Sequence, residues 1–202
     1  MIQAEKISKS FGDKMLFRDL SFTIQDGEYV CFSGESGTGK TTLLNIIGLL
    51  EPIDSGRLII NGKSSRKRKE LQEYYRNEVG FLFQNFALIE NKTVEQNLKI
   101  VITNDKNTVS MKDALRWVGL EQKQKNKVYT LSGGEQQRIA LARLLLKPCS
   151  IILADEPTGS LDQRNAEIVM TLLERLHTLG KTVILVSHDD AIKQRAERII
   201  YL

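Results

Sequence analysis

The strongest constraint on this sequence is a short glycine-rich stretch, residues 34–41, with the form G-x-x-x-x-G-K-[ST]. An apolar run at 29–32 precedes it, and apolar residues at helical spacing follow it from Leu43 onward. Strand, tight loop and helix in this order form the context that a phosphate-binding loop requires. Lys40 would place its charge on the outer phosphates, and Thr41 would offer its hydroxyl to Mg²⁺. We therefore expect nucleotide binding here, rather than a glycine-rich turn that merely precedes a helix.

Size and composition are those of one ordinary globular domain. The chain has 202 residues, of which 41% are hydrophobic and 27% are charged. This length suffices for a substantial core. The net charge of +4 is too small to indicate an anionic macromolecular partner by itself. No apolar run is long enough to cross a bilayer, and the first residues lack signal-peptide character, so we expect neither feature.

The two cysteines, Cys31 and Cys149, lie far apart, each beside an apolar run. No C-x-x-C pair and no Cys/His spacing typical of zinc is present. We expect both to be reduced residues of the core.

Local patterns predict a β-rich beginning, an α/β core and a helical insertion. Asp26-Gly27 has the composition of a hairpin turn, residues 11–14 predict another turn, and Leu115 and Trp117 are expected in the core. Helical spacing from Ile168 to Leu179, followed by Gly180, predicts a long helix with a glycine cap. Strands are expected at 2–7, 20–24, 56–60, 79–83, 150–154, 182–186 and 198–202, helices at 71–76 and from Thr93, Ser110 and Ser132, and polar loops at 104–108 and 121–127.

A basic run occupies residues 63–69 and contains no apolar residue. Two interpretations stay open, a solvated connection leading into a helix and a patch, centred on Arg66 to Lys69, that contacts anionic lipid. We favour the first, because only this segment is basic and no aromatic residue is interleaved in it.

A second anion-binding element is predicted at residues 131–137, Leu-Ser-Gly-Gly-Glu-Gln-Gln. Ser132 and Glu135 have the spacing of a capping box, so Ser132 should begin a helix. Gly133 and Gly134 would leave the N–H groups of its first turn accessible. A plain capped helix is the simpler alternative.

Polar residues follow two further predicted strands. Asp155 and Glu156 come directly after the apolar run 151–154, and His188 comes after 182–186. Carboxyl ends of strands face the crevice in which α/β folds bind ligands. One carboxylate could face Mg²⁺ while the other activates water, and His188 could reach a phosphate. His177, on the long helix, is interpreted as structural or solvated.

In these motifs and in their order, over essentially its whole length, the sequence resembles the nucleotide-binding subunit of an ATP-binding cassette (ABC) transporter. Gln84 corresponds to the lever loop, and Ser160-Leu161-Asp162 follows the two carboxylates as in that family. The resemblance is strongest to the group that serves lipoprotein-release, macrolide-efflux and cell-division transporters. Residues 81–89 resemble the small ATPases linked to bacteriocin export. The implied fold is an α/β P-loop NTPase core, residues 1–64 and 150–202, with an N-terminal antiparallel β subdomain, and a lever loop and inserted α-helical subdomain at 65–149.

The resemblance also implies the role of each motif residue. Glu156 would polarise the attacking water, and His188 would sense the γ-phosphate. Phe11, where the family more often has tyrosine, would stack on adenine. The implied catalytic residues are Glu156, His188, Gln84 and Lys40; the implied nucleotide-binding residues are Phe11, Gly34, Ser36, Gly37, Thr38, Gly39, Lys40, Thr41, Thr42, Ser132, Gly133, Gly134 and Asp162; the implied Mg²⁺ ligands are Thr41, Gln84 and Asp155.

The implied activity is ATP hydrolysis, with ATP and Mg²⁺ bound in a head-to-tail dimer. Ser132, Gly134 and Asp162 would act in trans, on the nucleotide held by a second and, we expect, identical ATPase subunit. Residues 85–98, which begin at Asn85 and end at Leu98, would grip an integral membrane permease, so the chain would be peripheral at the cytoplasmic face of the cell membrane. No nucleic acid is expected as a partner.

Export of a bacteriocin, peptide, lipoprotein or drug, or mechanotransmission, is the function that the resemblance favours. Uptake or cell-division systems remain alternatives, because import and export ATPases share every motif above. A non-transport ABC ATPase is disfavoured, because such proteins usually need a long coiled-coil insertion or two tandem cassettes, which 202 residues cannot hold.

Overall fold

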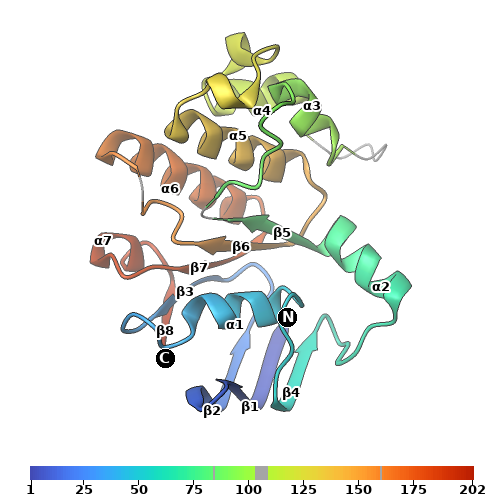
Figure 1. The fold of residues 1–202 in the computed structure, drawn as a ribbon, viewed down its shortest axis with the longest axis vertical. Helices are drawn as coiled ribbons and strands as arrows, with labels where there is room; N and C mark the ends of the chain where they lie inside the picture. Colours follow the sequence, from blue (N-terminus) through green and yellow to red (C-terminus); the bar gives the residue numbers. More distant parts are fainter. Residues whose placement is uncertain (84, 103–108, 160) are drawn as a thin grey trace.

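The computed structural model describes all residues except 84, 103–108 and 160. Two β-sheets and two groups of helices lie one above another in the ribbon (Figure 1). The strands are β1 (Ile2–Phe11), β2 (Lys14–Ile24), β3 (Tyr29–Ser33), β4 (Ser55–Ile60), β5 (Val79–Leu82), β6 (Ile151–Asp155), β7 (Thr182–Val186) and β8 (Arg198–Tyr201). The helices are α1 (Lys40–Ile47), α2 (Arg68–Glu73), α3 (Val94–Lys99), α4 (Met111–Trp117), α5 (Gly133–Leu146), α6 (Gln163–Thr178) and α7 (Asp190–Lys193), with the short helices η1 (Tyr74–Glu78), η2 (Glu121–Lys123) and η3 (Val128–Thr130).

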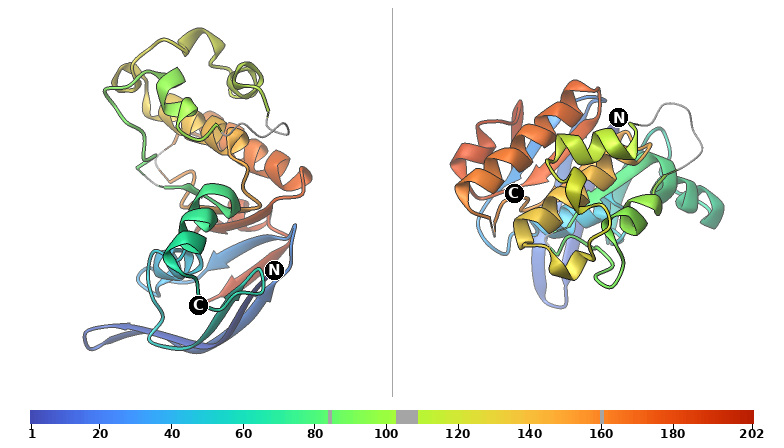
Figure 2. Two further views of the ribbon diagram at one scale, coloured as in Figure 1. Left: turned by 90° about the vertical axis from the view of Figure 1, so that its right-hand side faces the viewer. Right: turned by 90° about the horizontal axis from the view of Figure 1, so that it is seen from above.

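The smaller sheet is antiparallel, with the strand order β2-β1-β4. Its β1–β2 hairpin turns at Gly12 and Asp13, where the sequence predicts a turn, and this pairs Phe11 with Lys14. The sheet lies at the opposite end of the molecule from α3 and α4, as two perpendicular views show (Figures 1 and 2). It is the predicted N-terminal antiparallel β subdomain.

The larger sheet has the order β5-β6-β7-β3-β8, and every neighbouring pair in it is parallel. Because parallel strands end at the same edge, the segments that follow β3, β6 and β7 emerge side by side. This is the α/β core expected from the sequence.

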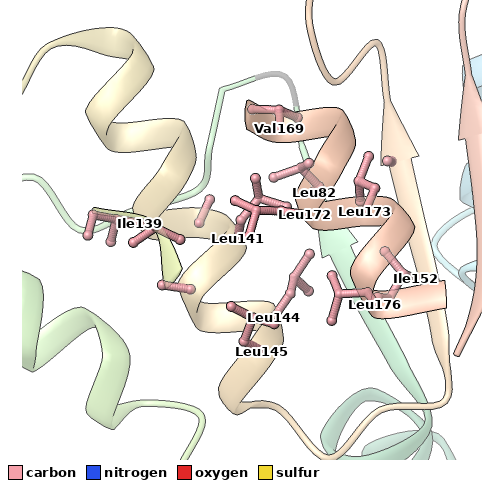
Figure 3. Packing of buried hydrophobic residues seen from close by; sticks show 14 of the residues in the cluster. Leu82, Ile139, Leu141, Leu144, Leu145, Ile152, Val169, Leu172, Leu173 and Leu176 are labelled. Carbon is pink, nitrogen blue, oxygen red and sulfur yellow. The ribbon is translucent and has the colours of Figure 1, made fainter. Parts of the chain in front are cut away.

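Two hydrophobic cores occupy the two faces of this sheet. The core below it packs α1 and the antiparallel sheet, and the core above it packs α5 and α6. Along β6 the side chains alternate between them, with Ile151 and Leu153 below and Ile152 and Ala154 above. Figure 3 shows the upper core, in which leucines of α5 meet those of α6 over the sheet.

The helical segment begins its helices where the sequence predicts. Thr93, Ser110 and Ser132 are the N-caps of α3, α4 and α5, and each side chain accepts a hydrogen bond from a backbone N–H three residues later. The division of the chain at 65 and 149 stays a prediction. One strand within that range, β5, is nevertheless hydrogen-bonded to β6 of the parallel sheet, because strand order in a sheet does not follow chain order.

One expectation about turns is wrong, and the interpretation of the basic run fails at one residue, Arg66. Asp26-Gly27 does form a turn, but the strands that it joins, β2 and β3, belong to different sheets, so they form no hairpin. The basic run is exposed at 63–65 and 67–69 and leads into α2, as the favoured interpretation expects, and only Arg66 departs from it. The Arg66 side chain is 4% exposed, pairs with Glu78 at 3.3 Å, and lies 4.6 Å from the ring centroid of Tyr74. Internal pairing of this kind removes Arg66 from any lipid-facing patch.

Two apolar residues also differ from expectation. Leu179 is 56% exposed, because α6 ends just before it and Gly180 turns the chain away with a φ of +84°. Trp117 is only partly buried, and the Arg175 guanidinium lies 3.5 Å from its ring centroid.

The predicted loop at 104–108 lies outside the described residues, and 121–127 includes the short helix η2. Both cysteines are buried and free, as predicted. Among the described residues, no helix combines the length and apolar character that crossing a membrane requires.

Candidate nucleotide-binding site

The carboxyl ends of three adjacent strands bring the predicted motifs together. The glycine-rich loop follows β3, Asp155 ends β6, and His188 follows β7. Asp155 pairs in register with Val186 across β6 and β7, and the Glu156 N–H donates to the Val186 carbonyl at 3.1 Å. The sheet therefore places residues far apart in the sequence at one edge.

The loop wraps around the amino group of Lys40, the first residue of α1. This side chain is buried, and its Nζ donates to the carbonyls of Gly34 at 2.9 Å and Glu35 at 2.6 Å. Gly39 precedes it with a φ of +95°, and a Cβ there would lie 3.0 Å from the Leu16 side chain. Only glycine fits this conformation and this close approach.

A cavity of about 420 Å³ opens beside the loop. Eight predicted site residues line it: Phe11, Ser36, Gly37, Gly39, Lys40, Thr41, Thr42 and Glu156. Gly34 and Thr38 belong to the same loop without lining the cavity, and the Thr38 hydroxyl donates to the Glu35 carbonyl at 3.0 Å. The cavity thus joins the loop, the carboxylate after β6 and the end of the β1–β2 hairpin.

Three lining residues were missed in the sequence, namely Lys14, Leu16 and Val186. Lys14 is the most informative, because a Cβ on Gly37 would lie 3.3 Å from its Nζ. It therefore adds a second positive charge to the mouth of the cavity. The predicted turn at 11–14 contained the signal, since a tight hairpin places its first and last residues opposite each other.

Phe11 has the exposure that a stacking residue needs. Its side chain is 51% exposed at the end of β1. On the protein side, the Lys9 ammonium lies 5.0 Å from the ring centroid, and Glu51 holds that ammonium at 2.7 Å. The ring is supported from one side and open on the other.

Thr41 and Asp155 fit a Mg²⁺ site. The Thr41 hydroxyl donates to Asp155 Oδ1 at 3.0 Å, so two hard oxygen donors of the kind that Mg²⁺ prefers lie side by side. Burial raises the pKa of Asp155, and the charge of Glu156 adds to this, whereas the Thr41 hydrogen bond and the Lys40 charge oppose it. A bound cation would relieve that burial cost. Gln84, the third predicted ligand, lies outside the described residues.

Glu156 and His188 contact each other directly. His188 Nδ1 lies 2.9 Å from Glu156 Oε1, and the imidazole is otherwise 75% exposed. The Glu156 backbone has a φ of +43°, which is unusual for a residue with a side chain. The carboxylate thus stands on a constrained backbone and touches the predicted phosphate sensor.

The other predicted anion-binding element does not reach this cavity within one chain. Ser132 Oγ accepts from the Glu135 N–H at 3.3 Å, and the Glu135 carboxylate accepts from the Ser132 N–H at 2.9 Å, which completes the predicted capping box. Among the described residues that line the cavity, none comes from 131–137. Asp162 lies near this helix end instead, because Asn165 packs against Gly134 and donates its N–H to Asp162 at 2.9 Å.

Residues 17–159 match a family model described as ABC transporter. The macrolide export ATP-binding/permease protein MacB of Mannheimia succiniciproducens is 36% identical over 99% of this chain. The match covers 33% of MacB, so the chain spans about a third of the length of such relatives. The ABC transporter ATP-binding protein YxdL of Bacillus subtilis is 35% identical over the whole chain and 83% of its own length.

The fold has close counterparts among solved structures. The ATP-binding cassette MJ0796, solved as a dimer in a post-hydrolysis state with ADP and Pi, superposes with a TM-score of 0.85. It shares 35% identity, and the match covers all of this chain and 94% of that one. A second dimeric structure of MJ0796 gives the same TM-score at 36% identity.

Proposed function

This chain belongs to the ABC transporter family as an ATP-binding, ATP-hydrolysing cassette, and we propose that two copies bind ATP between them to drive a membrane partner. One observation supports the proposal: the two predicted anion-binding elements, the loop beside Lys40 and the N-terminus of α5, lie apart within a single chain, and no described residue of 131–137 lines the cavity. A head-to-tail pair would bring the α5 end of each copy to the cavity of the other. The dimeric state of the related cassette MJ0796 supports this arrangement.

In such a site the residues of the chain divide the work of phosphoryl transfer, which needs mainly positioning and charge stabilisation. Phe11 stacks on adenine, and Lys40 neutralises the outer phosphates. Glu156 accepts a hydrogen bond from the attacking water, and His188 holds that carboxylate while facing the γ-phosphate. Mg²⁺, when bound at Thr41 and Asp155, would supply further neutralisation of phosphate charge.

The partner side of the proposal concerns residues 85–98. Ile89 is 48% exposed, and its backbone N–H and carbonyl are both hydrogen-bonded by the buried Asn97 side chain, at 2.8 and 3.0 Å. The Arg143 guanidinium of α5 donates to the carbonyls of Phe86 and Ala87. A permease helix bound at the exposed Ile89 would therefore be linked to α5 through the carbonyls of Phe86 and Ala87.

We propose export as the direction of transport and the cytoplasmic face of the membrane as the location. The support is the likeness to MacB, a protein in which a permease accompanies the ATP-binding part. Co-purification of the chain with the product of a neighbouring permease gene tests the partner. Recovery with a solute-binding uptake system instead would contradict export.

Ser132→Arg tests the shared site. A long cation at the α5 end should block approach of a second subunit, so hydrolysis should fall to background while the isolated chain binds ATP with unchanged Kd. Ser110→Arg is the matched control, because Ser110 caps α4 with the same bond, 3.1 Å long, and loss of either cap costs about 1 kcal/mol. Loss of ATP binding by the Ser132 variant alone would contradict action in trans.

A further inference from the structure

One side chain of α5 reaches the segment that carries Glu156. Gln137 is 3% exposed, and its Nε2 donates to the carbonyl of Pro157, the residue after Glu156. Gln137 does not line the cavity as described, so any effect that it has on the chemistry must act through Pro157.

Three hydrogen bonds hold the backbone at Glu156 and Pro157. The Glu156 N–H is bound by Val186 of β7 at 3.1 Å, and the Glu156 carbonyl accepts from the Gly159 N–H at 3.2 Å. The bond from Gln137 to Pro157 is the third. A left-handed backbone at a residue with a side chain persists only where its surroundings hold it, so each of these bonds bears on where the carboxylate points.

The first turns of α5 also contact the start of α6. The Arg138 guanidinium donates to the side-chain oxygen of Asn165, and the N–H of Asn165 caps onto Asp162. Gly134 lies so close that a Cβ there would sit 2.8 Å from Asn165 Cγ. Helix α5 therefore contacts Pro157, directly after Glu156, and Asn165, in the first turn of α6.

Helix α5 is well placed to move these contacts as one body. Its residues Leu141 and Leu144 lie between α5 and α6 in the core above the sheet (Figure 3). Packed interiors transmit small displacements rather than absorbing them. A shift at its N-terminus would reach Gln137 one turn later.

Packing alone does not explain Gln137. Its Oε1 is buried and has no hydrogen-bond partner among the described residues. A buried acceptor that lacks a partner opposes folding, so an apolar side chain of this size would suit the position better if only stability mattered.

We propose that Gln137 is a positioning residue that ties Glu156 to the N-terminal turns of α5. Closing of α5 on the nucleotide held by the second subunit then adjusts Glu156 in the chain's own cavity, and the two ATP sites of the dimer become coupled. The inference rests on the proposed function, because it requires the α5 end to meet a nucleotide in trans.

The test compares Gln137→Met and Gln137→Glu with wild type, all as full chains. Both variants remove the donor to Pro157, and the second replaces it with an acceptor. We expect kcat to fall roughly 10- to 100-fold, as for other small misplacements of a catalytic group. The KM for ATP should stay within about twofold and the Hill coefficient should move toward one, because nucleotide contacts remain while coupling is lost. Two variants are made so that the test can be completed even if one of them does not fold.

Tyr74→Phe is the matched control. It removes another buried bond from a side chain to a carbonyl, that of the Tyr74 hydroxyl to Ile47 at 2.8 Å, away from Glu156. We expect this variant to lose comparable thermal stability and to keep its kcat. A Gln137 variant whose kcat equals that of Tyr74→Phe would overturn the inference.

Dimerisation separates this inference from the proposed function. In a Glu156→Gln background, ATP should still produce a dimer in gel filtration with and without Gln137→Met. Loss of the dimer only when Gln137 is changed would show that the residue builds the interface, which overturns a positioning role. Absence of any ATP-dependent dimer in the Glu156→Gln protein would instead contradict the proposed function.

Discussion

His188 Nδ1 lies 2.9 Å from Glu156 Oε1, and these two residues follow the neighbouring strands β7 and β6. A carboxylate held by an imidazole is well oriented to accept a hydrogen bond from water. We therefore expect changes in this pair to lower the rate of ATP hydrolysis and to leave ATP binding in place.

Glu156→Gln should slow single-turnover hydrolysis about 10²- to 10⁴-fold, the usual contribution of a positioned base. ATP binding should persist, because Lys40 and the loop are untouched. His188→Ala should also lower the rate, by removing the partner that orients the carboxylate. His177→Ala is the control, since His177 contacts the Gly27 carbonyl at 2.7 Å, away from this pair. Wild-type rates for Glu156→Gln would rule out its role.

Phe11→Ala should weaken ATP binding by about 1–3 kcal/mol, the usual cost of losing one aromatic stacking partner of a base. Binding of inorganic tripolyphosphate, which has no base, should be unchanged. Titration calorimetry with both ligands measures the difference. Phe11→Tyr keeps the ring and serves as control; an equal loss for both ligands would show that Phe11 supports the loop rather than adenine.

Asp155→Asn should stabilise the free chain while removing Mg²⁺-dependent hydrolysis. Because burial raises the pKa of Asp155, the folded state binds this proton more tightly than the unfolded state does. The contribution of Asp155 to stability is therefore greatest below its unfolded pKa and is lost as pH rises through the folded value. The gain in Tm of the variant should grow as pH rises above the unfolded value of about 3.9 and should level off above the raised pKa of the folded state. A gain that is constant with pH would contradict this origin.

Gly133→Ala probes the partner without disturbing the chain. A Cβ at Gly133 would meet no described atom within 4 Å, whereas one at Gly134 would lie 2.8 Å from Asn165. Gly133→Ala should keep its Tm within a degree or two and still lower hydrolysis, because an approaching nucleotide needs the bare backbone. Gly134→Ala should lower both, with a stability loss of about 1–3 kcal/mol typical of overpacking. Full activity of Gly133→Ala would argue against close approach there.

Local chemistry explains why much of the fold was predictable. The caps at Thr93, Ser110 and Ser132 depend on residues three positions apart, and the buried strands are short apolar runs. Both signals lie within a few residues of chain. The association of the loop after β3 with Asp155 followed from one further rule, that parallel strands end at the same edge.

Long-range contacts were not predictable in this way. Nothing local shows that β3 lies between β7 and β8, and so Asp26-Gly27 was interpreted as a hairpin turn. The bond from Gln137 to Pro157 joins residues 20 positions apart and depends on how α5 packs over the sheet. Lys14 was missed because its charge matters only once the hairpin is folded against the loop.

The alternation along β6 has a consequence for the carboxylates at its end. Ile151 and Leu153 face one core, whereas Ile152 and Ala154 face the other. A slip of this strand by one residue would exchange all four side chains between differently shaped interiors and would carry Asp155 away from Thr41. The register that places Asp155, a predicted metal ligand, beside Thr41 is thus the register that the packing already favours. The packing of apolar side chains along β6 is therefore enough to place Asp155 beside Thr41, and no bound ligand is needed to hold it there.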